Sequence, residues 1–216
     1  MIVAIDGPAG SGKSTIAKEL AKKLGFTYID TGAMYRALAL KVIKMNIDPQ
    51  NQEQVVNILE KTDIKLSEDK VFLDGVDVSS EIRTEEVGNV ASLIARYKKV
   101  REVMVEKQRE IGKSAKNAVI EGRDAGTKIF PDADLKVFMT AKPEVRAQRR
   151  VNQLKEKGFV VDYNHILQKI IERDKMDYER QESPLRPTED YIILDTTDKT
   201  IEEVLQFLES LIKRWV

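Results

Sequence analysis

A glycine-rich stretch close to the start of the chain has the residue types and spacing of a phosphate-binding loop. Residues 7–15 read GPAGSGKST, in which Gly7 and Gly12 precede Lys13 and Ser14. Glycines allow backbone N–H groups to turn toward phosphate oxygens, and the N-terminus of a following helix adds partial positive charge. The spacing predicts a P-loop in which Lys13 contacts the β- and γ-phosphates of a nucleotide and Ser14 ligates Mg2+. The expected phosphate-binding residues are Gly7, Pro8, Ala9, Gly10, Ser11, Gly12, Lys13, Ser14 and Thr15.

Several arginines form a second group that could bind an anion. Arg36 follows DTGAMY (30–35), Arg123 lies in EGRDAGT (121–127), and Arg173 and Arg180 flank Asp177 in ERDKMDYER. A single arginine is more often solvated, but guanidinium groups beyond neighbouring strand ends match the oxygens of a phosphate monoester. These arginines predict a phosphate-bearing acceptor opposite the P-loop.

Alternating strands and helices would position both groups. Short apolar runs typical of strands covered on both faces alternate with amphipathic helical stretches, which predicts an α/β fold. Its parallel sheet would carry helices on both faces and ligands at the carboxyl ends of its strands. Residues 63–83 differ: short alternating runs and the DG pair at 74–75 predict a small antiparallel lobe. The expected strands of the main sheet are 2–6, 26–30, 118–122, 135–141 and 191–196.

Composition excludes several other classes of function. Lys plus Arg (36) equals Asp plus Glu (36), so no overall charge attracts nucleic acid or an anionic membrane. The absence of cysteine and the single histidine, His165, exclude thiolate and multi-histidine metal centres. With no signal peptide or spanning segment, we expect a cytoplasmic protein, and a monomer is the default expectation.

A P-loop indicates that a nucleotide is bound, but it does not indicate which reaction the bound nucleotide undergoes. A switch GTPase would carry an NKxD element after a later strand, and residues 137–144 (VFMTAKPE) contain none. A motor or transport ATPase would need partner domains that 216 residues hardly accommodate. A small-molecule kinase fits best because it needs a second anion site, and a nucleotide-dependent regulatory switch is the non-enzyme alternative.

Motifs spread over essentially the whole chain resemble those of the bacterial (d)CMP kinases, the cytidylate kinase family of nucleoside monophosphate kinases. The motifs are GPAGSGKST, DTGAMYR, EIRTEEVGNVAS, VR at 100–101, EGRDAGT, RDKMDYER and SPL at 183–185. The resemblance implies a three-layer P-loop NTPase fold with a five-stranded parallel sheet, ATP and Mg2+ as the donor system, and CMP and dCMP as acceptors. It further implies a CMP-binding insert at about 63–83, a mobile lid at about 149–162, and a core of residues 1–62, 84–148 and 163–216.

The same resemblance implies roles for residues of the acceptor site. Arg36, Arg123 and Arg180 would hold the CMP phosphate, and two arginines of the lid would close over the γ-phosphate. The remaining acceptor-site residues are Thr31 and Tyr35 lining the site, Ser92, Arg101 and Asp124 on the cytosine, and Arg173 and Asp177 on the sugar. The lid candidates are Arg149 and Arg150, for which a solvent-facing basic stripe is the alternative. Ala125 departs from the family pattern, where a larger apolar residue is expected.

Chemistry supports the assignment of the base independently of the resemblance. The exocyclic amino group of cytosine donates to a carboxylate, whereas uracil presents an oxygen that would leave Asp124 unpaired. We therefore expect UMP to be disfavoured by a few kcal/mol. A UMP/CMP kinase of broader range and a shikimate-type kinase are the alternative enzymes. Asp30, Glu121 and Asp124 all lie near strand ends, and the sequence does not rank them as outer contacts of Mg2+.

Overall fold

A computed structural model of the chain describes residues 1–67, 70–156 and 158–213. Residues 68 and 69 belong to the predicted insert, residue 157 to the predicted lid, and residues 214 and 215 to the predicted C-terminal helix. These positions lie outside the described residues.

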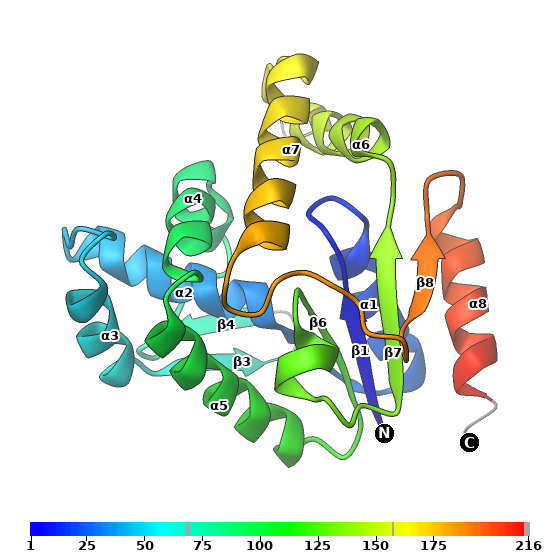
Figure 1. The fold of residues 1–216 in the computed structure, drawn as a ribbon, viewed down its shortest axis with the longest axis horizontal. Helices are drawn as coiled ribbons and strands as arrows, with labels where there is room; N and C mark the ends of the chain where they lie inside the picture. The colour runs from blue at the N-terminus through cyan, green and yellow to red at the C-terminus, as the bar shows by residue number, and fades with distance from the viewer. Residues whose placement is uncertain (68–69, 157, 214–216) are drawn as a thin grey trace.

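The central element is a five-stranded parallel sheet in the order β2-β6-β1-β7-β8 (Figure 1). Its register pairs Ile2 with Ala118 and Val3 with Leu135. The predicted α/β class and parallel sheet are confirmed, and the order places the strand that leads into the P-loop in the middle. The strands are β1 (Ile2–Asp6), β2 (Thr27–Asp30), β6 (Ala118–Gly122), β7 (Leu135–Thr140) and β8 (Ile192–Asp195).

Helices cover both faces of this sheet, which explains the continuous apolar runs of its strands. On one face, Val3 and Ile5 of β1 pack in the same cluster as residues of α1 (Lys13–Leu24) and α8 (Ile201–Ile212). On the other face, Ala4 packs with residues of β2 and β6 and with Ile111 of α5 (Lys98–Ser114). Helix α8 begins with the predicted capping box of Thr200 and Glu203.

A second core lies beside the sheet. It joins α2 (Thr31–Lys44), α3 (Gln52–Glu60), α4 (Glu85–Ile94) and part of α5 to a small antiparallel sheet. That sheet contains β3 (Ile64–Ser67), β4 (Lys70–Leu73) and β5 (Val76–Asp77), followed by a 3-10 turn at Glu81–Arg83. The predicted antiparallel lobe is confirmed, whereas the boundaries of core, insert and lid stay predictions.

The hairpin between β4 and β5 follows from its turn residues. Asp74 and Gly75 have φ of 50° and 83°, the left-handed pair that a two-residue hairpin turn with a DG sequence favours. The run VDVS at 76–79 makes a strand of only two residues. Beyond Asp77 the chain bends because the Asp77 carboxylate accepts hydrogen bonds from the N–H and the hydroxyl of Ser79.

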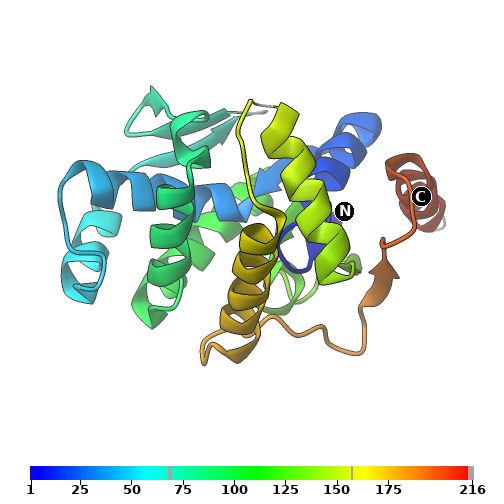
Figure 2. The same ribbon diagram turned by 90° about the horizontal axis from the view of Figure 1, so that it is seen from above.

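Two helices lie beyond the carboxyl ends of β1 and β7. Helix α6 (Pro143–Glu156) begins at a proline, and α7 (Tyr163–Glu179) begins after Asp162, whose side chain accepts from the His165 N–H. Figure 1 shows both helices above the sheet, and Figure 2 shows them from above on either side of the loop that joins β1 to α1. The segment after β6 forms a π-helical turn at Ala125–Ile129, which the sequence did not predict.

Candidate active site

The predicted P-loop joins β1 to α1 at the centre of the sheet. Its conformation requires glycine at two positions in particular. A Cβ on Gly7, at φ 150°, would lie 2.0 Å from the carbonyl oxygen of Met139, and Gly12, at φ 92°, caps α1 in the left-handed region. Lys13 is buried, and its Nζ donates to the carbonyl of Pro8 at 2.8 Å. The loop thus folds around its own lysine, while Ser14 and Thr15 are exposed in the first turn of α1.

The environment of Lys13 in the folded protein favours its neutral form over the ammonium form. Burial, together with the positive charges of Arg123 and Arg173, lowers its pKa from 10.5 to about 7. Glu121 and Asp6 act in the opposite direction. Because the charges of Arg123 and Arg173 act on Lys13, these arginines lie in its neighbourhood, and an anion placed in this region would favour the ammonium form.

The arginines that follow the strands converge on that region. Arg36, Arg123, Arg173 and Arg180, hereafter the arginine cluster, are linked by mutual repulsion. Burial lowers the pKa of Arg173 to about 10, with further contributions from Arg123 and Arg36. Asp177 holds the cluster together: its Oδ2 accepts from Arg123 Nε at 2.8 Å, and its Oδ1 lies 3.9 Å from Arg180. The cluster has more positive than negative groups, which suits it to a phosphate.

A buried ion pair borders the arginine cluster. Arg101 donates to Asp124, both are 4% exposed, and the Arg101 guanidinium lies 5.7 Å from the centre of the Tyr35 ring. Burial is also the main cause that raises the pKa of the Tyr35 hydroxyl to about 12.

Several buried polar atoms around the arginine cluster have no hydrogen-bond partner among the described residues. Buried polar groups in native proteins are almost always paired, so these atoms indicate room for a polar ligand. They are the Tyr35 hydroxyl, Arg101 Nε, Arg173 Nε and Arg180 Nη2.

Three other predicted site residues donate hydrogen bonds to backbone carbonyl groups of the protein. The Thr31 hydroxyl donates to the carbonyl of Glu121 at 2.7 Å, and the Ser92 hydroxyl donates to that of Gly88 at 2.9 Å. An Arg36 Nη1–H donates to the carbonyl of Ile82 at 3.0 Å. The ligand roles of these residues stay predictions.

The two lid candidates on α6 differ in surroundings. Arg149 donates to the Thr196 hydroxyl at 3.1 Å and to its carbonyl at 2.6 Å, and that hydroxyl in turn donates to the carbonyl of Ser11 in the P-loop. Arg150 is exposed. The pKa of Arg36 is lowered mainly by burial, and the charge of Arg150 also lowers it. Arg149 therefore lies on the P-loop side and Arg150 on the side of the arginine cluster.

The carboxylates that the sequence offers as outer contacts of Mg2+ already accept hydrogen bonds from the protein in two cases, Asp30 and Glu121. Asp30 caps α2 by accepting from the Ala33 N–H, and burial, followed by the charge of Glu121, raises its pKa to about 6. Glu121 accepts from the Tyr28 hydroxyl at 2.7 Å. In the described ranges, no three His, Cys, Asp or Glu side chains group so that they could hold a metal ion. The ligation of Mg2+ by Ser14, beside substrate phosphates and water, stays a prediction.

Sequence reasoning missed residues that connect the site to the fold. Arg146 is 3% exposed and donates to the carbonyls of Ala141 and Ala9, each at 2.9 Å, and to both oxygens of Asp174. It therefore joins α6, α7 and the P-loop. Its place in RAQRR, three residues before Arg149, was a usable signal, but helical spacing does not reveal which arginine faces inward. Asp6 is 1% exposed at the end of β1, and an acid directly before the first P-loop glycine was the signal for it.

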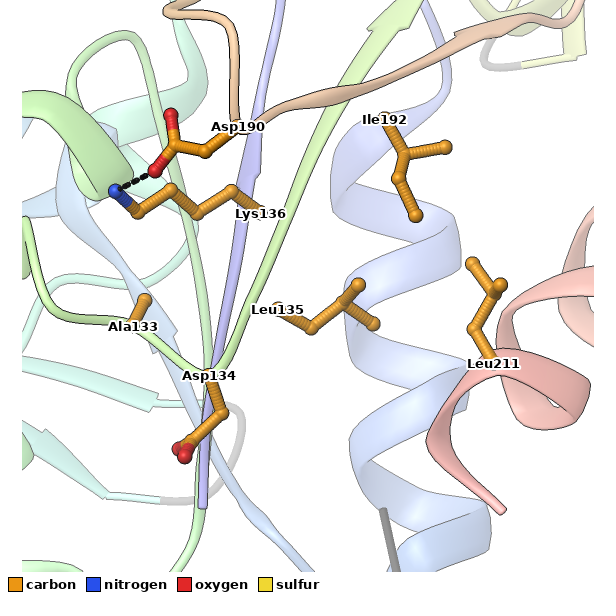
Figure 3. Close-up of a pocket in the computed structure, with 7 residues that line it drawn as sticks. All are labelled: Ala133, Asp134, Leu135, Lys136, Asp190, Ile192 and Leu211. Carbon is orange, nitrogen blue, oxygen red and sulfur yellow. Dashed lines mark hydrogen bonds and ion pairs between the residues drawn. The ribbon is translucent and has the colours of Figure 1, made fainter. Parts of the chain in front are cut away.

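A hollow of about 610 Å3 lies at the opposite end of the sheet (Figure 3). It is lined by the start of β7, by Ile192 of β8 and by Leu211 of α8, while the P-loop follows the other end of β1. Its lysine, Lys136, is paired with Asp190, so no unbalanced cation is available there for a phosphate. The hollow is therefore separate from the site described above.

No helix in the described part of the chain combines the length and the apolar character needed to cross a bilayer.

Comparisons with known proteins agree with the geometry. The family model described as cytidylate kinase matches residues 3–214. A protein of Caldanaerobacter subterraneus subsp. tengcongensis named cytidylate kinase is 50% identical over 212 residues, covering 98% of this chain and 94% of that protein. A Bacillus subtilis protein of the same name is 45% identical over 206 residues, covering 94% and 92%. The crystal structure of shikimate kinase from Bacteroides thetaiotaomicron is similar in fold alone, with a TM-score of 0.50, 15% identity, and coverage of 99% and 98%.

Proposed function

Because the chain belongs to the cytidylate kinase family, we propose that the P-loop and the arginine cluster together transfer the γ-phosphate of ATP to CMP or dCMP. The products are ADP and CDP or dCDP. The observation that carries the proposal is the electrostatic coupling of Lys13 to Arg123 and Arg173, because it brings a donor-phosphate lysine and acceptor-side arginines to one region.

On the donor side, the P-loop holds the phosphates of ATP through its backbone N–H groups. Lys13 leaves the Pro8 carbonyl and takes up the β- and γ-phosphate oxygens. Mg2+, with Ser14 as its protein ligand, neutralises charge on the same oxygens. Arg149 supports this side through Thr196, and Arg150 faces the transferring group from the side of the arginine cluster.

On the acceptor side, Arg36, Arg123 and Arg180 hold the phosphate of CMP, and the unpaired Nη2 of Arg180 supplies a donor to it. Arg173, through its unpaired Nε, and Asp177 contact the sugar, and Asp177 also keeps the Arg123 guanidinium oriented. Asp124 accepts from the cytosine amino group, while Arg101, stacked on Tyr35, is the donor for the other base atoms.

The reaction needs no protein base. The attacking oxygen of the CMP phosphate is anionic near neutral pH, so catalysis rests on in-line positioning and on neutralising charge at the transferring group. Lysine and arginine side chains suit that task because they remain cationic beside a phosphate. His165, exposed on α7, has no part in it.

A coupled assay of ADP release against CMP, dCMP, UMP, AMP and GMP tests the proposal. Turnover with CMP and dCMP well above the other acceptors is the expected result. Lys13→Ala should suppress turnover with every acceptor, whereas Arg36→Ala should lower kcat/KM for CMP by about 100-fold and spare ATP binding. The exposed Arg96→Ala is the matched control. A wild-type protein that binds ATP tightly without phosphorylating either cytidine nucleotide would instead support the regulatory switch.

A further inference from the structure

Asp6 connects two segments that are far apart in the sequence and that carry opposite halves of the site. It is the last residue of β1, directly before the P-loop, and it is 1% exposed. Its Oδ1 accepts from the Ala125 N–H at 2.9 Å, and its Oδ2 accepts from the Gly126 N–H at 2.9 Å and from the Tyr191 hydroxyl at 2.7 Å. The residues just before Ala125 are Arg123 and Asp124, both assigned above to the acceptor.

The segment that Asp6 holds depends on this anchor. Residues 125–129 form a π-helical turn, and the first N–H groups of any helix lack partners within it. Asp6 supplies those partners. The position is tightly packed, because a Cβ on Gly126 would lie 2.5 Å from the Tyr191 hydroxyl. Tyr191 is fixed in turn by an edge-to-face contact with Phe138 of β7, with ring centres 6.4 Å apart.

The charge of Asp6 also acts on Lys13 of the P-loop and on Arg123 of the arginine cluster. It raises the pKa of Lys13 and of Arg123, acting against the burial that lowers both. All three hydrogen-bond partners of Asp6 are donors, so an acceptor-only carboxylate fits them and an amide does not. None of the three contacts involves a residue that the proposed function assigns to a substrate.

We propose that Asp6 is a positioning residue that holds Arg123 and Asp124 in register with Lys13, so that acceptor and donor phosphates align for transfer. The inference rests on the proposed function. It differs from a simple stabilising role because it requires the loss of Asp6 to change how the acceptor is oriented and discriminated. A displacement of about 1 Å at the reacting atoms costs about 100-fold in rate, which sets the size of the expected effect.

The test compares Asp6→Asn and Tyr191→Phe with Asp134→Asn. Asp134 is the matched control because its carboxylate also accepts from a β1 N–H, that of Ile2, but at the other end of the strand. We expect Asp6→Asn to lower kcat/KM for CMP by about 100-fold and to lower the ratio of kcat/KM for CMP to that for UMP. Its Kd for ATP alone should change by less than about threefold, since the P-loop contacts remain. Asp134→Asn should match the wild type in every measurement.

Tyr191→Phe keeps the inference testable if Asp6→Asn does not fold. Loss of one hydroxyl donor should lower kcat/KM for CMP by about three- to tenfold, together with the CMP-to-UMP ratio. Wild-type kinetics in Tyr191→Phe or in folded Asp6→Asn would overturn the inference. So would a loss of ATP affinity in parallel with activity at an unchanged CMP-to-UMP ratio, which is the pattern of general destabilisation. Failure of the proposed function is distinguishable, because the wild type itself would then leave CMP unphosphorylated.

Discussion

Lys13 is buried before any nucleotide is bound, and its environment disfavours the charge that its proposed role requires. Its pKa is 10.5 in the unfolded chain and about 7 in the folded protein. Between these values the unfolded chain binds more protons, so the contribution of this group to the free energy of unfolding rises with pH across that window. A triphosphate beside Lys13 reverses the balance by favouring the ammonium form.

Proton uptake on ATP binding is the expected consequence. At about pH 8 the free protein holds Lys13 largely neutral, so binding should take up close to one proton, and at about pH 6 much less. Calorimetric binding enthalpies in buffers of different ionisation enthalpy measure this number. Lys13→Met, which keeps the loop amides, should take up none at this position. A wild-type protein without uptake at the higher pH would contradict the assignment.

Asp124 combines a structural ion pair with the predicted reading of the base. Asp124→Asn would place an amide N–H₂ where a uracil oxygen can accept it, so the ratio of kcat/KM for CMP to that for UMP should fall by about tenfold or more. The buried guanidinium of Arg101 would also lose its charged partner, at a cost of about 1–3 kcal/mol in unfolding free energy. Steady-state kinetics with both nucleotides and denaturant unfolding measure the two effects. Asp134→Asn, at the far end of the sheet, should leave the ratio unchanged, and an unchanged ratio in Asp124→Asn would disprove its role.

Among the elements, α6 and α7 are joined to each other and to the P-loop by Arg146. Its contacts reach Ala9 in the loop and Asp174 on α7, the helix that also carries Arg173 and Asp177 and that ends directly before Arg180. A side chain that binds three elements at once restricts how far α6 and α7 can move relative to the P-loop. The predicted lid at about 149–162 begins just after this anchored residue.

A double-mutant cycle on Arg146 and Asp174 tests this link. Arg146→Met and Asp174→Asn should each destabilise the protein, because the first leaves the partly buried Asp174 carboxylate without its partner and the second removes the counter-charge of the buried Arg146. Their coupling energy should be about 1–3 kcal/mol. The matched control is Lys23 and Glu209, which join α1 to α8 at 2.9 Å with Lys23 40% exposed. Exposed pairs couple by about 0.5 kcal/mol. Equal coupling in the two cycles, measured by denaturant unfolding, would show that Arg146 does not hold these elements together.

For the whole molecule, the important feature is that a protein of zero net charge contains a strongly cationic interior region. The second core formed by α2–α5 and the small sheet carries Arg36 and Arg101, while the sheet core carries Lys13 and Arg123. The site therefore lies where two packed bodies meet. A ligand that contacts both bodies stabilises the folded state more than one that contacts either.

A dinucleotide that joins adenosine and cytidine through a chain of phosphates should reveal this arrangement. It should raise Tm more than ATP and CMP added separately at the same concentration, because stabilisation grows with affinity for the native state. Arg36→Ala and Arg123→Ala should each remove most of the difference. A dinucleotide no more effective than ATP alone would indicate that the two phosphate sites do not face each other.

The elements governed by local rules were predictable from the sequence. The P-loop, the strands of the main sheet, the DG hairpin and the capping box of α8 each depend on residues within a few positions of one another. Their spacing therefore encodes them directly, and all of them are present in the structure. The arginines could be named as candidates for the same reason, since each directly follows a recognisable strand or lies in a recognisable motif.

Contacts between residues that are distant along the chain could not be predicted from local patterns. The position of β1 between β6 and β7 depends on how the helices pack on the two faces of the sheet. The strand order therefore cannot be predicted from any local sequence pattern. Asp6 reaches residues 125, 126 and 191, and Arg146 rather than Arg149 faces inward, because burial depends on which neighbours the whole fold supplies. The amino-acid types and their local spacing are enough to name the side chains that could bind phosphate. The packing of its two cores decided which of those side chains meet, since contacts across long sequence separations form only when the entire fold is assembled.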